Sequence, residues 1–346
     1  MSLKFIIFFS FLTARALLAG VQAGEVIPDP GGRVHVERRA FLMGTTCAID
    51  GWASSRARGL AAIEAAFRAT ESTEARLSTW RAGTALARLN AAPVETPVPL
   101  DRDLMDLLVW LGDRTRETGG AFDPAIGRLV AAWDLRGPGR IPSARELTLA
   151  RRASGMALFH LTPGAGTAIR RAPGALLDAG GFGKGLALKK AGRSLSGRLD
   201  HWLMNFGGQV LVSRGGAGRV VDLADPRHRG RSAGTLRVSG VSVATSSDSE
   251  RFVRAGGRRL GHILDPRTGK PAPDFGSVTV VSADPLEADV MSTALFVMGP
   301  EEGLAFAASR PGLEALFLES VTGGLKARQT PGMPLYHLHL CLLTEP

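Results

Sequence analysis

The sequence predicts a single α+β domain in which mixed sheets pack against helices. Segments typical of strands and of helices follow one another without the regular alternation of a doubly wound parallel sheet. The 346 residues are 45% hydrophobic and 21% charged, a composition that can form a large core. No linker rich in proline, glycine or serine divides the chain, and it contains no repeat of fixed period. We therefore expect one domain over residues 24–346.

The expected domain begins with two paired strands over residues 34–50. A helix follows, on which Leu60, Ile63 and Phe67 form one apolar stripe. Residues 71–90 are then expected to form a loop and a short polar helix.

A second amphipathic helix is expected after residue 101. Its apolar stripe consists of Leu104, Leu107, Leu108 and Leu111. Asp101 can cap its first turn, and Gly119-Gly120 ends it. The stretch 138–155 is rich in loop-forming residues, and strands are expected over residues 156–162 and 167–171.

The rest of the domain is expected to contain one helix, a series of strands and two further helices. The first helix covers residues 183–195, after a glycine turn. Strands are expected near residues 202–213, 218–223, 235–245 and 277–283. Helices near residues 285–298 and 300–309 precede a strand near residues 314–319, and residues 336–343 are compatible with one more strand.

Residues 1–23 have the pattern of an export signal peptide. Lys4 provides a positive start, residues 5–12 are apolar, and Val21-Gln22-Ala23 suits a cleavage site. Arg15 interrupts the apolar stretch, which is too short to span a bilayer stably. We expect a periplasmic or otherwise exported protein, with an amphipathic anchor or a misassigned start as the alternatives. No cysteine lies near the signal, so the sequence does not support a lipid-modified N-terminus.

The charge and the cysteines exclude some classes of protein. The net charge is +10, but the basic residues are scattered and aromatic residues make up only 6%, so we expect no nucleic-acid partner. Peripheral proximity to a membrane remains compatible with this charge. Cys47 and Cys341 lie far apart and lack metal-ligand spacing, so two buried free thiols are expected, with a disulfide left open.

A glycine-rich segment over residues 177–185 enters the helix expected at residue 183. Its glycines allow a ligand to approach the backbone, and the helix start presents free N–H groups to anionic oxygens. Lys184 adds a charge that can pair with phosphate. The spacing matches neither a P-loop nor a dinucleotide fingerprint, so a turn packed for its shape is an equal interpretation.

A second group of candidates lies in the helix expected near residue 289. Asp289 and Thr293 are four residues apart, so their oxygens share one face, and Ser292 lies at its edge. A carboxylate with hydroxyls suits a hard cation such as Mg²⁺. The alternative is that Asp289 caps the helix and Thr293 bonds back to the preceding turn.

His262 precedes an ordinary turn sequence, residues 265–269, and an imidazole there can take a hydroxyl proton near neutral pH. A structural histidine at a strand end is the alternative. The loops at residues 120–127 and 205–208 resemble ligand loops that specify no chemistry alone. The sequence contains no nucleophile elbow, no thiol–histidine relay and no zinc-spaced cluster.

Nine segments of the chain, in this order, resemble motifs of the ApbE family, the FAD:protein FMN transferases. They are residues 43–45, 74–80 with 89–90, 120–127 with Trp133, 178–185, 205–208, 244–251, 262–269, 277–280 and 288–293. The similarity extends over residues 40–320. It implies an α+β fold related to the tunnelling-fold domains.

The resemblance also implies an activity. Such an enzyme uses Mg²⁺ and FAD, transfers FMN through a phosphoester bond to a threonine or serine of a partner protein, and releases AMP. The partner would be a redox subunit facing the periplasm. The alternatives are an FAD pyrophosphatase that produces FMN and AMP, and a periplasmic FAD-binding protein without catalysis.

The resemblance assigns roles to individual residues. The FAD site would be formed by Met43, Trp80, the backbone of Ala121, Phe122 and Asp123, and by Asp178, Lys184 and Leu264. Mg²⁺ would be held by the carbonyl of Gly181, Asp289 and Thr293, with Ser292 as a further candidate. His262 would be the base for the acceptor hydroxyl.

The chain departs from the family pattern at several positions. Trp80 replaces a usual tyrosine, and Ser247 and Ser249 replace a glycine and a tyrosine. Gly261 replaces a frequent histidine, and Lys189 stands where aspartate is common. These departures leave the Mg²⁺ and base candidates in place, and they bear on the expected efficiency and choice of partner more than on the class of reaction.

Overall fold

The computed structural model describes residues 31–79, 81, 83–249 and 252–341. The expected signal peptide and Trp80 lie outside these residues, so both remain predictions. No helix within the described ranges is both long and apolar enough to cross a membrane.

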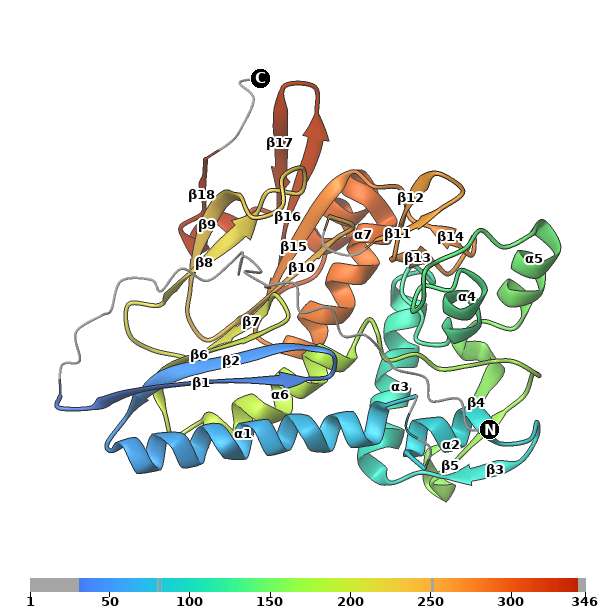
Figure 1. Ribbon diagram of the computed structural model, residues 1–346, viewed down its shortest axis with the longest axis horizontal. Helices are drawn as coiled ribbons and strands as arrows, with labels where there is room; N and C mark the ends of the chain where they lie inside the picture. The colour runs from blue at the N-terminus through green and yellow to red at the C-terminus, as the bar shows by residue number, and fades with distance from the viewer. Residues whose placement is uncertain (1–30, 80, 82, 250–251, 342–346) are drawn as a thin grey trace, which may run out of the picture.

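An eight-stranded antiparallel sheet forms the centre of the domain (Figure 1). Its order is β1-β2-β6-β7-β10-β15-β16-β17. The strands are β1 (Val34–Leu42), β2 (Thr45–Ala53), β6 (Asp200–Phe206), β7 (Gln209–Val212), β10 (Ser242–Ser247), β15 (Gly276–Ser282), β16 (Leu313–Val321) and β17 (Gly324–Gln329). Because each strand pairs antiparallel with its neighbours, no crossover helix is needed within the sheet.

Three long helices cover one face of this sheet, and Figure 1 shows α1 lying beside α6. They are α1 (Arg56–Leu77), α6 (Gly183–Leu195) and α7 (Pro285–Ala308). Ile63 of α1 and Leu188 of α6 are fully buried against Ile49 of β2, while α7 packs on β10, β15 and β16. Helices α6 and α7 also pack against each other on this face.

A small sheet covers the opposite face. It consists of β8 (Arg219–Ala224), β9 (Ser232–Val238) and β18 (His339–Leu340). In β6, Met204 packs with the helices and Leu203 packs with Val221 and Leu236 of the small sheet. This alternation follows from the pleat of the strand, so the central sheet is buried on both faces.

The remaining elements gather at one end of the sheet, on the right of Figure 1. The helices are α2 (Ala85–Ala91), α3 (Arg102–Glu117), α4 (Gly127–Ala132) and α5 (Ala144–Arg152), with 3-10 turns at Met156–Leu158 and Pro163–Ala165, whereas a third 3-10 turn, Met333–Tyr336, packs on β9 and β16. The strands are β3 (Pro97–Pro99), β4 (Phe159–Thr162), β5 (Thr167–Arg170), β11 (Phe252–Ala255), β12 (Arg258–Gly261), β13 (Leu264–Asp265) and β14 (Lys270–Pro271).

Several sequence predictions are confirmed. Helix α3 starts where Asp101 accepts the N–H of Leu104, and α6 has the predicted bounds. The two helices predicted around residue 300 are the two halves of α7, separated at Gly299, whose φ is 80°.

Other sequence predictions were wrong. The loop-rich stretch 138–155 contains α5. Helix α1 continues to Leu77, into the segment 71–90 that was predicted to hold a loop and a short helix, and the short helix is α2. The segments 202–213 and 235–245 each contain two strands, and β17 was not predicted. Cys47 is buried, but Cys341 is exposed, and the two thiols are not bonded. Burial raises the pKa of Cys47 to about 12.

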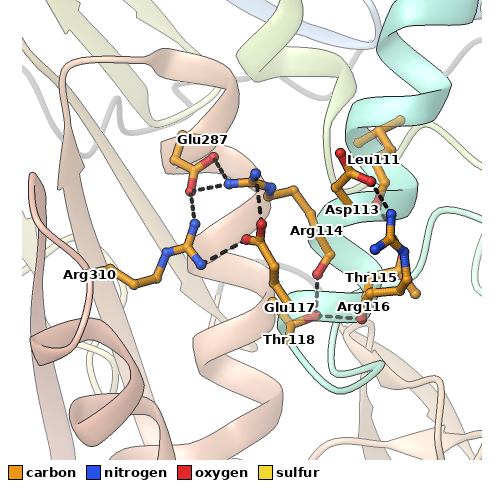
Figure 2. A network of polar contacts seen from close by, with 9 residues as sticks. All are labelled: Leu111, Asp113, Arg114, Thr115, Arg116, Glu117, Thr118, Glu287 and Arg310. Atoms are coloured by element: carbon orange, nitrogen blue, oxygen red, sulfur yellow. Dashed lines mark hydrogen bonds and ion pairs between the residues drawn. The ribbon is translucent and has the colours of Figure 1, made fainter.

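A closed ring of four charges joins α3 to the start of α7 (Figure 2). Arg114 lies 3.0 Å from Glu117 and 3.3 Å from Glu287, and Arg310 lies 2.8 Å from Glu117 and 3.3 Å from Glu287. Burial raises the pKa of Glu287, and both arginines oppose this effect. The ring therefore fixes the position of α7 two residues before Asp289.

Arg114→Ala is expected to lower the free energy of unfolding by about 2–3 kcal/mol, because it leaves Glu287 buried with one cation. Arg116→Ala is the matched control on the same helix. Its side chain is 78% exposed and pairs with Asp113 on the surface, so a loss below about 0.5 kcal/mol is expected. Urea unfolding measures both values, and equal losses would contradict this role of the ring.

Candidate active site

The start of α6 is capped by a residue from another helix. The N-cap residue of α6, Phe182, has no side chain that can accept the free N–H groups. Instead, Oδ2 of Asp289 on α7 accepts the N–H of Gly185 at 2.8 Å. The two helices meet closely here, because a Cβ at Gly185 would lie 2.5 Å from the carbonyl oxygen of Pro285.

The Asp289 carboxylate is buried, with 4% of the residue exposed. Burial raises its pKa, and the charge of Lys184 and the N–H groups of Gly185 and Lys184 oppose this effect. The Lys184 ammonium lies 3.9 Å from Oδ1. A helix N-terminus with a lysine also attracts the oxygens of a phosphate. The start of α6 thus combines a buried anion with an anion-attracting backbone.

The structure brings three of the four metal candidates together. The Thr293 hydroxyl donates to the backbone carbonyl of Asp289 at 3.3 Å, and a Cβ at Gly181 would lie 3.6 Å from that hydroxyl. The Ser292 hydroxyl donates to the same carbonyl at 2.9 Å and accepts from Ser246 of β10 at 2.9 Å. Ser292 therefore faces β10, whereas Asp289, Thr293 and Gly181 face the start of α6.

These residues fit Mg²⁺. Among the described residues, no three His, Cys, Asp or Glu side chains cluster, so a transition-metal site of that kind is absent there. One carboxylate, one hydroxyl and one carbonyl are hard oxygen ligands, and Mg²⁺ usually keeps waters and shares phosphate oxygens. The hydrogen bond from the Thr293 hydroxyl to the Asp289 carbonyl is the bond to the preceding turn that was the alternative to metal binding. A hydroxyl that donates its proton keeps its oxygen lone pairs, so this bond is compatible with binding a cation.

The glycine-rich segment before α6 is held from two sides. The Asn90 amide donates to the carbonyl of Leu177 at 2.9 Å and accepts its N–H at 2.8 Å. Asp178 accepts the N–H of Gly180 at 2.8 Å and forms an ion pair with Arg136. Asn90 and Asp178 therefore fix the backbone that leads to Gly181.

A cleft of about 720 Å³ opens beside this segment. Its polar lining includes Thr79, Asn90, Asp134, Arg136 and Asp178. Burial lowers the pKa of Arg136, and the charge of Asp178 raises it. Sequence reasoning missed Arg136, because a single arginine in a loop carries no pattern.

The expected FAD-site residues lie around α6 in different ways. Met43 and Phe122 pack against the glycines before and at the start of α6. A Cβ atom added to Gly183 would lie 3.3 Å from the methyl group of Met43, and one added to Gly181 would lie 3.2 Å from the ring of Phe122. The Asp123 carboxylate instead accepts the N–H groups of Ala125 and Met156, and burial raises its pKa.

The other expected FAD-site residues are buried to different degrees. Ala121 and Leu264 are buried, and Leu264 packs with Leu129 and Trp133. Lys184 is 29% exposed at the start of α6. Contacts of all these residues with FAD remain predictions.

His262 forms a pair with Asp248. Oδ1 of Asp248 lies 3.1 Å from Nδ1 of His262 and accepts its backbone N–H at 3.0 Å. Asp248 is 2% exposed, and a Cβ at Gly261 would lie 2.0 Å from its Oδ2. The glycine that replaces the family's histidine therefore makes room for this carboxylate. The sequence resemblance included Asp248 but did not assign it this role.

Strand β10 links the His262–Asp248 pair to the Asp289 group. Ser246 near the end of β10 donates to Ser292, which adjoins Thr293 on α7. Asp248 follows directly after β10. The site therefore connects an oriented imidazole, through β10 and α7, to a buried carboxylate at a helix N-terminus.

Gly185→Ala is expected to lower the free energy of unfolding by about 1–3 kcal/mol, because the added methyl group would force α6 away from α7. The same shift would separate Asp289 from the start of α6. Gly112→Ala in α3 is the control, since its nearest contact is Met156 at 3.7 Å. It should be neutral or stabilising by up to about 1 kcal/mol. Thermal unfolding that ranks the variants in reverse would contradict the close contact.

The fold and this site describe an α+β protein that handles a phosphate-bearing ligand. The chain belongs to the ApbE family, whose model matches residues 43–317. A relative from Treponema pallidum (strain Nichols), named FAD:protein FMN transferase, is 33% identical over 312 residues, which cover 83% of this chain and 86% of its own. A Rhodobacter capsulatus relative of that name is 31% identical and covers 94% of this chain and 62% of its own.

Solved structures agree with the family assignment. The ApbE protein from Thermotoga maritima has a TM-score of 0.78 and 26% identity, and the match covers 88% of this chain and 99% of that one. The Pseudomonas stutzeri flavinyl transferase ApbE, in its apo form, has a TM-score of 0.76 and 24% identity, and the match covers 89% of this chain and 98% of that one. The predicted α+β class and family are therefore confirmed.

Proposed function

We propose that this protein is an FAD:protein FMN transferase. It splits FAD, attaches the FMN half through a phosphoester bond to a threonine or serine of an acceptor protein, and releases AMP. The observation that carries the proposal is the placement of Asp289 and Lys184 at the start of α6, linked through β10 to the His262–Asp248 pair. The 33% identity to a relative of that name supports it.

The start of α6 receives the pyrophosphate of FAD. Its free N–H groups and Lys184 attract the phosphate oxygens, and the glycines allow close approach. The Gly181 carbonyl, Asp289 and Thr293 would hold Mg²⁺. The chemistry that a bound Mg²⁺ supplies is neutralisation of charge at the phosphates and stabilisation of the departing AMP. Ser292 contributes through its bond to Ser246, which positions α7.

His262 serves as the base for the acceptor hydroxyl. With the Nδ1 proton donated to Asp248, the lone pair of Nε2 accepts the hydroxyl proton. The hydroxyl oxygen then forms a bond to the phosphorus of the FMN half, the bond between that phosphorus and the bridging oxygen breaks, and AMP leaves with that oxygen. Asp248 stabilises the imidazolium by its negative charge.

The flavin and adenine parts of FAD occupy the surroundings of α6. Met43, Trp80, the backbone of residues 121–123, Asp178 and Leu264 bind FAD in this proposal. The acceptor is a redox subunit that faces the periplasm, where the export signal expected over residues 1–23 would deliver this protein.

The test is to incubate the protein with FAD, Mg²⁺ and a candidate acceptor protein. Flavin fluorescence on the acceptor band after denaturing electrophoresis is the expected result. Free FMN and AMP without a labelled acceptor would show that the site is an FAD pyrophosphatase. Unchanged FAD would show a binding protein without catalysis.

A further inference from the structure

We propose that the outer face of the β11–β12 hairpin is the docking surface for the acceptor protein, and that it recognises an acidic segment beside the acceptor hydroxyl. This inference rests on the proposed function. The chain passes from Asp248 into the hairpin and leaves it directly before His262. A segment bound on the hairpin is therefore held next to the Asp248–His262 pair.

The hairpin has one face that packs inward. The paired residues are Phe252 with Gly261, Val253 with Leu260, Arg254 with Arg259 and Ala255 with Arg258. Because side chains alternate along a strand, Val253 and Leu260 share one face. Leu260 packs on the cluster around Leu129, and a Cβ at Gly139 would lie 2.4 Å from that of Val253. This face anchors the hairpin to the domain.

The outer face presents an aromatic ring and two guanidinium groups. Phe252 is 37% exposed, and Arg254 and Arg259 are also exposed. The guanidinium carbon of Arg259 lies 4.3 Å from the centre of the Phe252 ring, and that of Arg254 lies 5.5 Å from it. These cation–π contacts hold both arginines over one ring, and Arg259 also donates to the Asp248 carbonyl at 2.6 Å.

The two guanidinium groups have only partial charge compensation from this chain, because Arg259 interacts with Asp274 through its charge. Arg254 and Arg259 lie directly opposite each other, and like charges at such positions destabilise a strand pair. Residues 252–261 contain no aspartate or glutamate, and no carboxylate of the described residues forms an ion pair with Arg254, whereas the charge of Arg259 opposes the rise that burial causes in the pKa of Asp274. A carboxylate supplied by the partner would bind both guanidinium groups and relieve their repulsion.

An apolar side chain extends the surface at the turn of the hairpin. Ile141 is 48% exposed, and its terminal methyl group lies 3.0 Å from the position of a Cβ at Gly256. The surface thus suits an acceptor segment that combines acidic residues with an apolar one. The competing occupant is the pyrophosphate of FAD, although Lys184 and the start of α6 already provide its cationic site.

The test measures binding separately from catalysis. Two fluorescent 15-residue peptides carry one central threonine and one leucine, with three aspartates in one peptide and three lysines in the other. Fluorescence anisotropy with the full-length protein should show at least about tenfold tighter binding of the aspartate peptide. Arg254→Glu with Arg259→Glu should abolish this preference. Arg198→Glu, which changes an exposed arginine three residues after the end of α6, should retain it.

Three results would overturn the proposal: equal or absent binding of the two peptides, a preference that survives the double substitution, or a loss of FAD binding in the double variant. FAD binding is followed by quenching of flavin fluorescence. AMP release from FAD is measured in the same samples. A protein that prefers the aspartate peptide but never cleaves FAD would refute the proposed function and leave the docking surface standing.

Discussion

Asp289→Asn is expected to lose FMN transfer by on the order of 100- to 1000-fold while the protein stays folded. The asparagine oxygen can still accept the N–H of Gly185, so the cap of α6 is kept. What disappears is the negative charge of the carboxylate, which would be the strongest Mg²⁺ ligand in the proposed group with Thr293 and Gly181. The substitution therefore separates metal binding from helix capping, which Asp289→Ala would remove together.

Two measurements check this prediction. The first is FMN transfer at saturating FAD, and the second is the shift of the melting temperature on adding Mg²⁺. A cation that binds only the folded state raises the melting temperature of the wild-type protein, and Asp289→Asn should remove that rise. The second readout does not depend on turnover.

Asp284→Asn is the matched control. Asp284 also lies at a helix start, where it accepts the N–H of Leu286 and pairs with Lys189, but its side chain is 38% exposed and outside the site. Its variant should keep both the transfer activity and the response to Mg²⁺. Full activity in Asp289→Asn would mean that the carboxylate serves only as the cap of α6.

The local parts of this site could be predicted from the sequence. The helix over residues 183–195 was predicted after a glycine turn and has these bounds, and the spacing of Asp289 and Thr293 places them on one helix face. The capping box of α5, formed by Ser143 and Glu146, was a usable signal that was overlooked. The helix was missed because Ala150 is its only buried residue.

The long-range parts could not be predicted. Asp289 caps a helix that starts about a hundred positions earlier in the chain, and no local pattern encodes that pairing. The close contact of α6 with α7 at Gly185 likewise depends on the packing of two distant segments. The Asp248–His262 pair was partly predictable from the sequence. Gly256-Gly257 could have indicated the hairpin that brings His262 back to Asp248.

His262→Ala is expected to lower the rate of FMN transfer by about 100- to 10,000-fold, the usual range for a general base. Its effect should fall on kcat, with the KM for FAD unchanged, because in the proposed mechanism the imidazole takes the proton of the acceptor hydroxyl and does not bind FAD. Asp248→Asn should lower kcat at least about tenfold, because it removes the charge that orients His262 and stabilises the imidazolium.

The double variant decides whether Asp248 acts through His262. If it does, Asp248→Asn should cost nothing further once His262 is alanine, since residues that act as a unit are not additive. Gly261→Ala should resemble Asp248→Asn, because its methyl group would occupy the space of the Asp248 carboxylate. Asp222→Asn, an exposed aspartate on β8, should behave as wild type. If the double variant instead loses activity by the product of the two single losses, Asp248 has a purely structural role in the fold around β10.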